Sequence, residues 1–165
     1  MSFDVTKDEI LRRLVQEHDR LINLIDQFTP TEIKTPGLLG NWSIRDLFAH
    51  LIAHEQRALL ELHYAQQGQH LHVVHAANDS FNDGATFACS LFDGATMRAV
   101  WEQSYRRVVE TVAALPAEIF LPTSSAVQIL DDSIDGALGN NTYGHYAEHR
   151  DDVERWLHSL HNMSP

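Results

Sequence analysis

The chain has one cysteine, Cys89, and nowhere do about 18 apolar residues follow one another. A single cysteine permits no internal disulfide, which is typical of proteins in a reducing compartment. The first residues carry neither the cationic nor the apolar segment of a secretion signal. The sequence therefore predicts a cytoplasmic protein with no membrane partner.

Basic residues are also scarce. Lys and Arg total 12 against 23 Asp and Glu, a formal net charge of −11. Such a chain repels a phosphate backbone unless its few cations gather on one face, and no basic cluster is visible. The sequence thus predicts no nucleic-acid partner. It also lacks a Gly-rich phosphate loop and a G-x-S-x-G motif, which excludes the commonest nucleotide-binding and esterase classes.

The remaining composition is that of an ordinary globular protein. Hydrophobic residues make up 44% of the chain and charged residues 21%, which argues against disorder. No repeat, linker or low-complexity tract divides the 165 residues. The chain is therefore expected to form a single domain over residues 1–165.

Apolar residues recur at three- and four-residue spacing in four segments, and no segment has the two-residue period of a strand. The predicted helices run from Lys7 to about Phe28, from Ser43 to near Gly68, from about Ala95 to Leu115 and from about Ser133 to Leu160. Thr6 with Glu9, and Ser43 with Asp46, have the spacing of N-terminal caps for the first two.

Four amphipathic helices bury their apolar stripes most simply as an all-α four-helix bundle. Residues 69–93 have no sustained period and are expected to form a long connection with room for one short helix. This connection would let the bundle depart from strict up-down order. Gly136, Gly139 and Gly144 each cost the last helix about 1 kcal/mol relative to alanine, so close packing or a nearby site is expected there.

Histidine, in contrast, is abundant, with 11 in the chain. Two pairs have the i, i+4 spacing of one helical face, namely His50 with His54 and His145 with His149. About 0.7 such pairs would arise by chance at this histidine frequency, so the spacing alone is weak evidence for a site. The position of each pair on its helix has to decide between a site and chance. His145 and His149 fall at the centre of the apolar stripe of the last helix, and both are expected to point into the core.

Two imidazoles one turn apart in a bundle core are costly unless something binds them. The alternative is that both are core histidines with hydrogen bonds to neighbours such as Asn141 or Tyr105. A metal is the preferred interpretation, and a facing helix would then supply His50 or His54, between which the pattern does not choose. Three imidazoles leave coordination positions open to water or substrate. Zinc and nickel are the first candidates, with iron and manganese as alternatives.

Other polar residues are interpreted more conservatively. The string from His145 to His149 matches H-x-x-E-H, a peptidase pattern, but Glu148 points away from the two histidines on a helical wheel. Glu148 and Glu55 are expected to be solvated or supporting carboxylates, and no residue is assigned a catalytic role. Three histidines in the long connection are expected to form an exposed surface group: His70, His72 and His75.

Two stretches resemble one family. Residues 41–55, NWSIRDLFAHLIAHE, resemble the W-S-x-x-D-x-x-x-H-x-x-x-x-E signature of DinB/YfiT-like proteins. Residues 141–149, NTYGHYAEH, followed by Trp156, are similar to the last-helix H-x-x-x-H of that superfamily in its ClbS/DfsB-like branch. The resemblance implies a four-helix bundle, often a homodimer, that holds a divalent metal with one histidine of the second helix and two of the last.

Carried over residue by residue, the resemblance makes His50, His145 and His149 the metal ligands. His54 stands where relatives usually carry an aromatic residue, so it is a candidate fourth ligand or pocket residue. The residues expected to line the pocket are Trp42, Asn141 and Tyr146.

The resemblance also suggests a function. Characterised relatives include transferases and isomerases that use low-molecular-weight thiols, and a branch that protects cells from a reactive natural product. A three-histidine metal can activate a thiol or water against a small electrophilic molecule, as in a thiol transferase or hydrolase. One alternative is a non-enzymatic protein that sequesters a small molecule in a cavity lined by Trp42, Trp101 and Tyr146. Another is a structural protein whose histidines satisfy one another.

Overall fold

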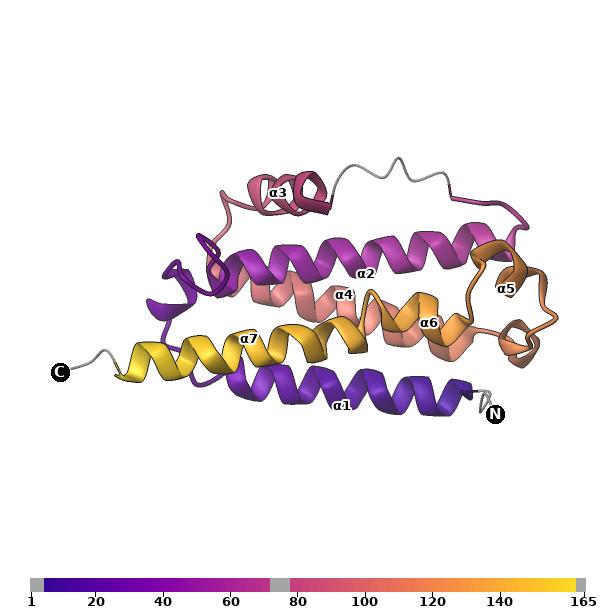
Figure 1. Ribbon diagram of the computed structural model, residues 1–165, viewed down its shortest axis with the longest axis horizontal. Helices are drawn as coiled ribbons and strands as arrows, with labels where there is room; N and C mark the ends of the chain where they lie inside the picture. Colours follow the sequence, from indigo (N-terminus) through magenta and orange to yellow (C-terminus); the bar gives the residue numbers. More distant parts are fainter. Residues whose placement is uncertain (1–4, 72–77, 163–165) are drawn as a thin grey trace.

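The computed structural model describes residues 5–71 and 78–162 and shows a bundle of long helices (Figure 1). The bundle consists of α1 (Lys7–Ile25), α2 (Ile44–Gln66), α4 (Gly94–Ala114) and α7 (Tyr143–Asn162). Shorter elements join them: η1 (Glu32–Lys34), α3 (Asn78–Ala88), η2 (Ala117–Phe120), α5 (Ser125–Leu130) and α6 (Ile134–Gly139). No strand occurs in the described ranges, and the all-α four-helix bundle is confirmed.

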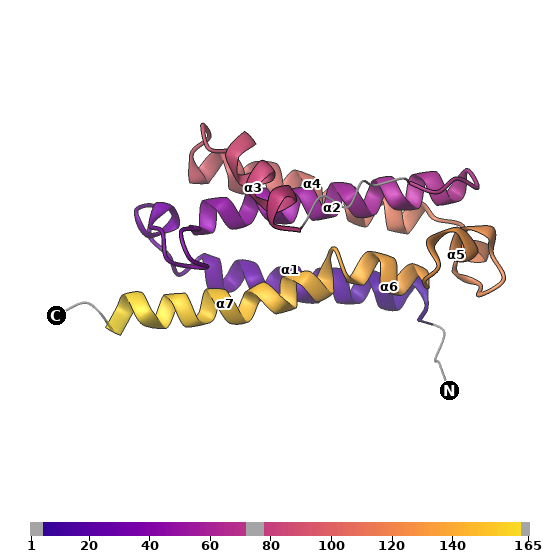
Figure 2. The ribbon, with the colours of Figure 1, turned by 45° about the horizontal axis from the view of Figure 1, so that its top comes forward.

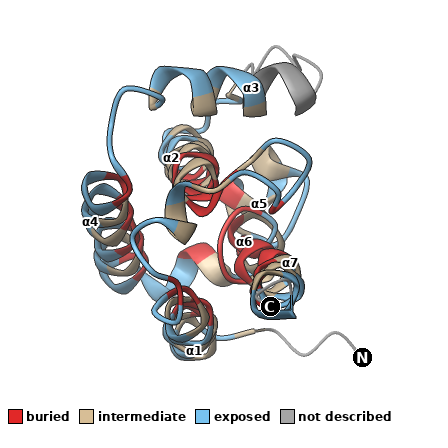
Figure 3. Cartoon of the chain, turned by 90° about the vertical axis from the view of Figure 1, so that its left-hand side faces the viewer, coloured by how far each residue is buried: buried red, intermediate tan, exposed pale blue. Residues whose placement is uncertain are grey.

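The long connection sets the direction of the bundle helices. α3 lies along the outside of α2, and α4 begins at the end of the bundle where α2 begins, so α2 and α4 run in one direction and α1 and α7 in the other (Figures 1 and 2). The bundle therefore departs from strict up-down order, as the connection predicted. α3 lies outside the core (Figure 3). His70 is exposed as expected, whereas His72 and His75 lie outside the described residues.

The buried residues lie on the helix faces that are turned towards the interior of the bundle (Figure 3). α1 packs chiefly on α7, and α2 chiefly on α4. Apolar residues at helical spacing supply this core, among them Ile10, Leu14, Leu47, Leu51 and Val108. None of the helices in the described part of the chain combines the length and apolarity that a membrane crossing requires.

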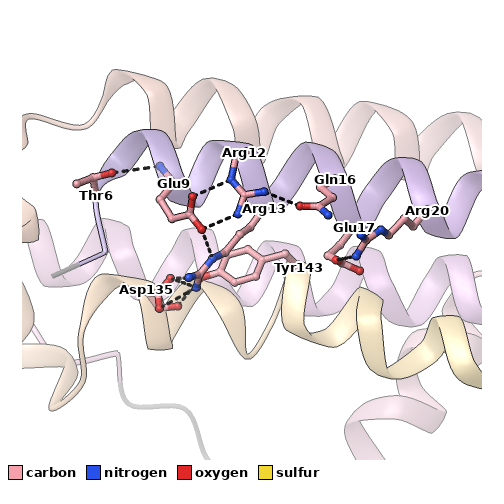
Figure 4. A network of polar contacts seen from close by, with 9 residues as sticks. All are labelled: Thr6, Glu9, Arg12, Arg13, Gln16, Glu17, Arg20, Asp135 and Tyr143. Atoms are coloured by element: carbon pink, nitrogen blue, oxygen red, sulfur yellow. Dashed lines mark hydrogen bonds and ion pairs between the residues drawn. The ribbon is translucent and has the colours of Figure 1, made fainter. Parts of the chain in front are cut away.

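Side-chain caps begin the first two bundle helices. The Thr6 hydroxyl accepts a hydrogen bond from the Glu9 N–H at 3.3 Å. At α2 the capping box is complete, since Ser43 accepts from the Asp46 N–H and Asp46 accepts from the Ser43 N–H. The reciprocal half expected at α1 does not form, because the Glu9 carboxylate binds two arginines of the next turn instead (Figure 4).

One of these arginines also joins α1 to the segment that precedes α7. Arg13 binds Glu9 at 2.9 Å and reaches the Asp135 carboxylate of α6 at 3.3 Å (Figure 4). The Tyr143 hydroxyl at the start of α7 donates to the backbone oxygen of Asp135 at 2.8 Å. This network ties the first turn of α7 to α1.

The last predicted helix is wrong in one respect, because the chain breaks it into α6 and α7 at residues 140–142. The backbone folds back on itself at the break, and a Cβ on Gly144 would lie 2.7 Å from the Gly139 carbonyl oxygen. At Gly136 and Gly139 a Cβ would also lie under 3.0 Å from a neighbouring side chain. Close packing thus occurs at all three glycines, as expected from the free energy that each glycine costs the helix.

A short loop ahead of α2 places Trp42. The backbone N–H groups of Gly37 and Leu38 both donate to the Trp42 carbonyl oxygen at 2.9 Å, which closes the loop on itself. Gly37 has φ +130° and packs against the Trp156 ring of α7. The loop is therefore braced against the last helix.

We expect Gly37→Ala to destabilise the fold by about 1–3 kcal/mol. Alanine at this position would have to adopt a disfavoured φ, and its Cβ would lie 2.5 Å from a Trp156 ring carbon. Gly40→Ala is the matched control, because Gly40 also has positive φ but a Cβ there meets no atom within 4 Å. Denaturant unfolding of both variants measures the difference, and equal losses would show that contact with Trp156 does not matter.

Candidate metal centre

Three histidine side chains from two helices meet inside the bundle. His50 comes from α2, and His145 and His149 come from successive turns of α7. The Nε2 atom of His145 lies 2.9 Å from the Nε2 atoms of both His50 and His149. One ring nitrogen from each of the three histidines lies within 4.8 Å of the other two. The structure thus brings together the three residues that the sequence singled out.

This arrangement suits a cation better than it suits hydrogen bonding. A neutral imidazole nitrogen carries either one N–H or one lone pair. The Nε2 atom of His145 therefore cannot form a well-directed hydrogen bond with both of its neighbours at once. Three converging lone pairs, in contrast, are the donor set of a divalent transition metal with three protein ligands.

A carboxylate fixes one of the three rings. The Asp152 Oδ2 atom lies 3.1 Å from His149 Nδ1, one turn further along α7. When Nδ1 donates its proton to that oxygen, Nε2 carries the lone pair that faces the cluster. The sequence analysis missed Asp152, although its i+3 spacing from His149 is a signal that could have found it.

We expect Asp152→Asn to weaken metal binding by about 10–100-fold, because loss of the carboxylate loosens the His149 ring and lowers its basicity. Asp151→Asn is the matched control, since Asp151 is the exposed neighbour on the same helix. Competition against a chromogenic chelator measures both affinities. Equal affinities of the two variants would contradict a supporting role for Asp152.

Burial keeps the cluster in its neutral, ligating form. Burial, followed by the charge of the neighbouring imidazoles, lowers the pKa of His50 to about 3 and that of His145 to about 2. Burial also lowers the pKa of His149, although Asp152 opposes the effect. Burial thus favours the unprotonated, ligating form of the three rings.

His54 lies beside the cluster. Its ring centroid is 4.3 Å from that of His145 and 4.5 Å from that of His50, while its Nδ1 atom lies 3.0 Å from the Asn141 amide oxygen. Trp42 lies on the other flank, with its ring centroid 5.0 Å from that of His50. Trp42 and Asn141 are thus placed near the histidines, as a pocket would require.

Tyr146 does not line this region, which corrects the expectation for it. Its side chain is fully buried, and its hydroxyl donates to the Glu55 carboxylate at 2.6 Å. Trp101 donates to the same Glu55 oxygen at 2.9 Å and is likewise buried in the core. Tyr146 follows His145 by one position and therefore points about 100° away from it around the helix.

Glu55 is not solvated, which excludes one of the two roles that the sequence left open for it, a solvated or a supporting carboxylate. It is fully buried between α2, α4 and α7, and it contacts the core aromatics rather than the histidines. Burial raises the pKa of Glu55 to about 7, although hydrogen bonds from Ser104, Tyr146 and Trp101 oppose the effect. Glu148, in contrast, is exposed as expected.

Solved structures share this fold. The chain is similar to the colibactin self-resistance protein ClbS, with a TM-score of 0.79, 11% identity and coverage of 93% of this chain and 96% of that one. It is also similar to an uncharacterised protein from Escherichia coli UTI89, with a TM-score of 0.79, 14% identity and coverage of 98% of this chain and 97% of that one. A third similar structure is the sibling lethal factor precursor DfsB, with a TM-score of 0.80, 9% identity and coverage of 97% of this chain and 98% of that one. These likenesses agree with the ClbS/DfsB-like resemblance of the sequence.

The ClbS structure corrects one prediction. It is described as a complex with dsDNA, which overturns the prediction that a chain of this fold has no nucleic-acid partner. The prediction rested on net charge and on the lack of a basic cluster along the sequence, whereas a basic face can be assembled from residues that are distant in sequence.

The remaining comparisons concern the sequence itself. No curated protein matches the chain. The sequence model of one protein family, the mycothiol maleylpyruvate isomerase N-terminal domain, matches residues 14–127 of this chain, which is more than half of its 165 residues. The chain therefore belongs to the mycothiol maleylpyruvate isomerase N-terminal domain family, within the DinB/YfiT-like superfamily.

Proposed function

We propose that the protein is a metal-dependent enzyme, in which His50, His145 and His149 hold a divalent transition metal that activates a thiol or water against a small electrophilic molecule. The observation that carries this proposal is the convergence of three buried Nε2 atoms on one point. Zinc and nickel suit an all-imidazole donor set, and iron and manganese are alternatives. Family membership supports the same assignment.

The chain's own residues prepare the site for this chemistry. A divalent cation on three imidazoles lowers the pKa of a bound water or thiol, which supplies a nucleophile at neutral pH. Asp152 orients the His149 ring, and burial keeps His50 and His145 neutral. Trp42 packs against His50, with the two ring centroids 5.0 Å apart.

Turnover of model electrophiles tests the proposal. Protein reconstituted with one metal at a time is mixed with an aryl halide or an activated ester, with and without cysteine as the thiol. The expected result is more than one product molecule per protein, lost in His145→Ala. Metal-loaded protein that gives no product with any of these electrophiles would contradict an enzymatic role.

Sequestration of a small molecule is the second candidate function. A cavity of about 460 Å³ is lined in part by His54 and Asn141, which lie beside the cluster. The structural relative ClbS is described as a self-resistance protein. A binder would take up one ligand per chain and release it unchanged, whereas an enzyme would convert it. Duplex DNA belongs among the ligands titrated, because the ClbS structure contains it.

A further inference from the structure

A stripe of polar residues runs along one face of α2 from the histidine cluster into a cavity. His50, His54, Arg57 and Glu61 follow one another at i, i+4, i+7 and i+11, which places them on one side of the helix. Arg57 and Glu61 are only partly buried and pair with each other, so this face opens into a cavity rather than into the apolar core. His54, Arg57 and Glu61 line the cavity of about 460 Å³ beside the cluster.

The rest of the lining comes from α5, from α6 and from the residues that follow each of them. Leu130 and Ala137 supply apolar surface there, and Asp132 and Asn141 supply polar groups. The Asp132 carboxylate accepts a hydrogen bond from the Ser133 N–H at 2.7 Å, which fixes its position. The cavity lining is thus mostly polar, with a smaller apolar part, which suits a polar rather than an apolar ligand.

Charges of both signs stand next to each other in this cavity. Arg57 Nε donates to Glu61 Oε1 at 2.8 Å, and the two side chains are only 25% and 20% exposed. The ion pair uses one guanidinium N–H and one carboxylate oxygen, so the other donors of Arg57 and the second oxygen of Glu61 can serve a ligand. Asp132 adds a further negative charge to the same lining.

We infer that this cavity binds the α-amino-acid head group of an elongated ligand, with the ligand carboxylate on Arg57 and its ammonium group between Glu61 and Asp132. Adjacent opposite charges on the protein match the adjacent carboxylate and ammonium of an amino acid. Guanidinium and carboxylate pair through strong charge-assisted hydrogen bonds. The inference rests on the proposed function, since it places the other end of the ligand at the metal.

Helix geometry gives the length of the ligand. Seven residues separate His50 from Arg57, which corresponds to about 10 Å along the helix axis. A ligand held by its head group at Arg57 therefore needs a chain of about this length to reach the cluster. His54 lies between the two ends, beside the path of that chain.

Two hydroxamates test the inference on zinc-loaded protein. L-2-Aminosuberic acid ω-hydroxamate carries a metal-binding group about 10 Å from an amino-acid head group, whereas octanohydroxamic acid has the same metal-binding group without the head group. Calorimetry is expected to show at least about tenfold tighter binding of the first. Arg57→Met and Glu61→Gln are each expected to reduce this preference and to leave the affinity for octanohydroxamic acid unchanged.

Arg20→Met is the matched control, because Arg20 forms a comparable ion pair with Glu17 on the surface of α1. Equal affinities for the two hydroxamates, or a preference that survives Arg57→Met, would overturn the inference while the metal assignment stands. If neither hydroxamate binds the zinc-treated protein, the metal assignment fails, and the position inferred for the head group fails with it.

Discussion

His145→Ala is expected to weaken metal binding by more than about 100-fold, beyond the usual effect of losing a residue that merely supports a ligand. His145 is the central member of the cluster, since its Nε2 atom lies 2.9 Å from those of both His50 and His149. Without it, two imidazoles from different helices remain, and the donor set no longer suits a stable site. Competition against a chelator measures the loss, and the stabilisation that added metal gives to the wild type should disappear with it.

His158→Ala is the matched control for this variant. His158 also lies on α7 but is exposed and distant in sequence from the cluster. Its replacement should leave the affinity for metal unchanged. Wild-type affinity in the His145 variant would show that the metal binds elsewhere or that the cluster is purely structural.

Glu55→Gln is expected to stabilise the protein at pH 8 by about 3 kcal/mol relative to the wild type. Burial raises the pKa of Glu55 from 4.5 to about 7, so the folded state prefers the protonated carboxyl. A folded-state pKa above the unfolded value means that the contribution of Glu55 to stability is fully present below pH 4.5. That contribution is lost as the pH rises towards 7. Glutamine resembles the protonated acid and can accept the same bonds from Trp101 and Tyr146 without this loss.

Urea unfolding between pH 4.5 and 8 of metal-free wild type and Glu55→Gln measures this effect. The histidine cluster titrates equally in both proteins, so the difference between the two curves isolates Glu55. The exposed residue Glu154 provides the control, and Glu154→Gln should keep the wild-type pH dependence. Parallel curves for Glu55→Gln and the wild type would contradict a raised pKa of Glu55 in the core.

Much of the fold could be predicted from the sequence because its signals are local. Apolar periodicity and the side-chain caps at Thr6 and Ser43 located the starts of α1 and α2. The break between α6 and α7 could not be predicted in the same way. It depends on how closely Gly144 approaches the Gly139 carbonyl group, a contact that no spacing rule describes.

Part of the candidate site could likewise be predicted from the sequence, and part of it could not. The i, i+4 spacing of His145 and His149 predicted that both rings face the core. The choice between His50 and His54 could not come from a helical wheel, because it depends on the relative rotation of α2 and α7, and the family resemblance supplied it. The partners of Glu55 come from α4 and α7, so only the folded chain shows that Glu55 is buried.

The metal content of the wild-type protein tests the central claim most directly. The protein is purified without a histidine tag or a nickel column and analysed by inductively coupled plasma mass spectrometry. The account predicts about one equivalent of a divalent transition metal per chain, either as purified or after incubation with zinc, nickel, iron or manganese. A folded protein that arrives empty and takes up none of the four would contradict a metal centre at His50, His145 and His149.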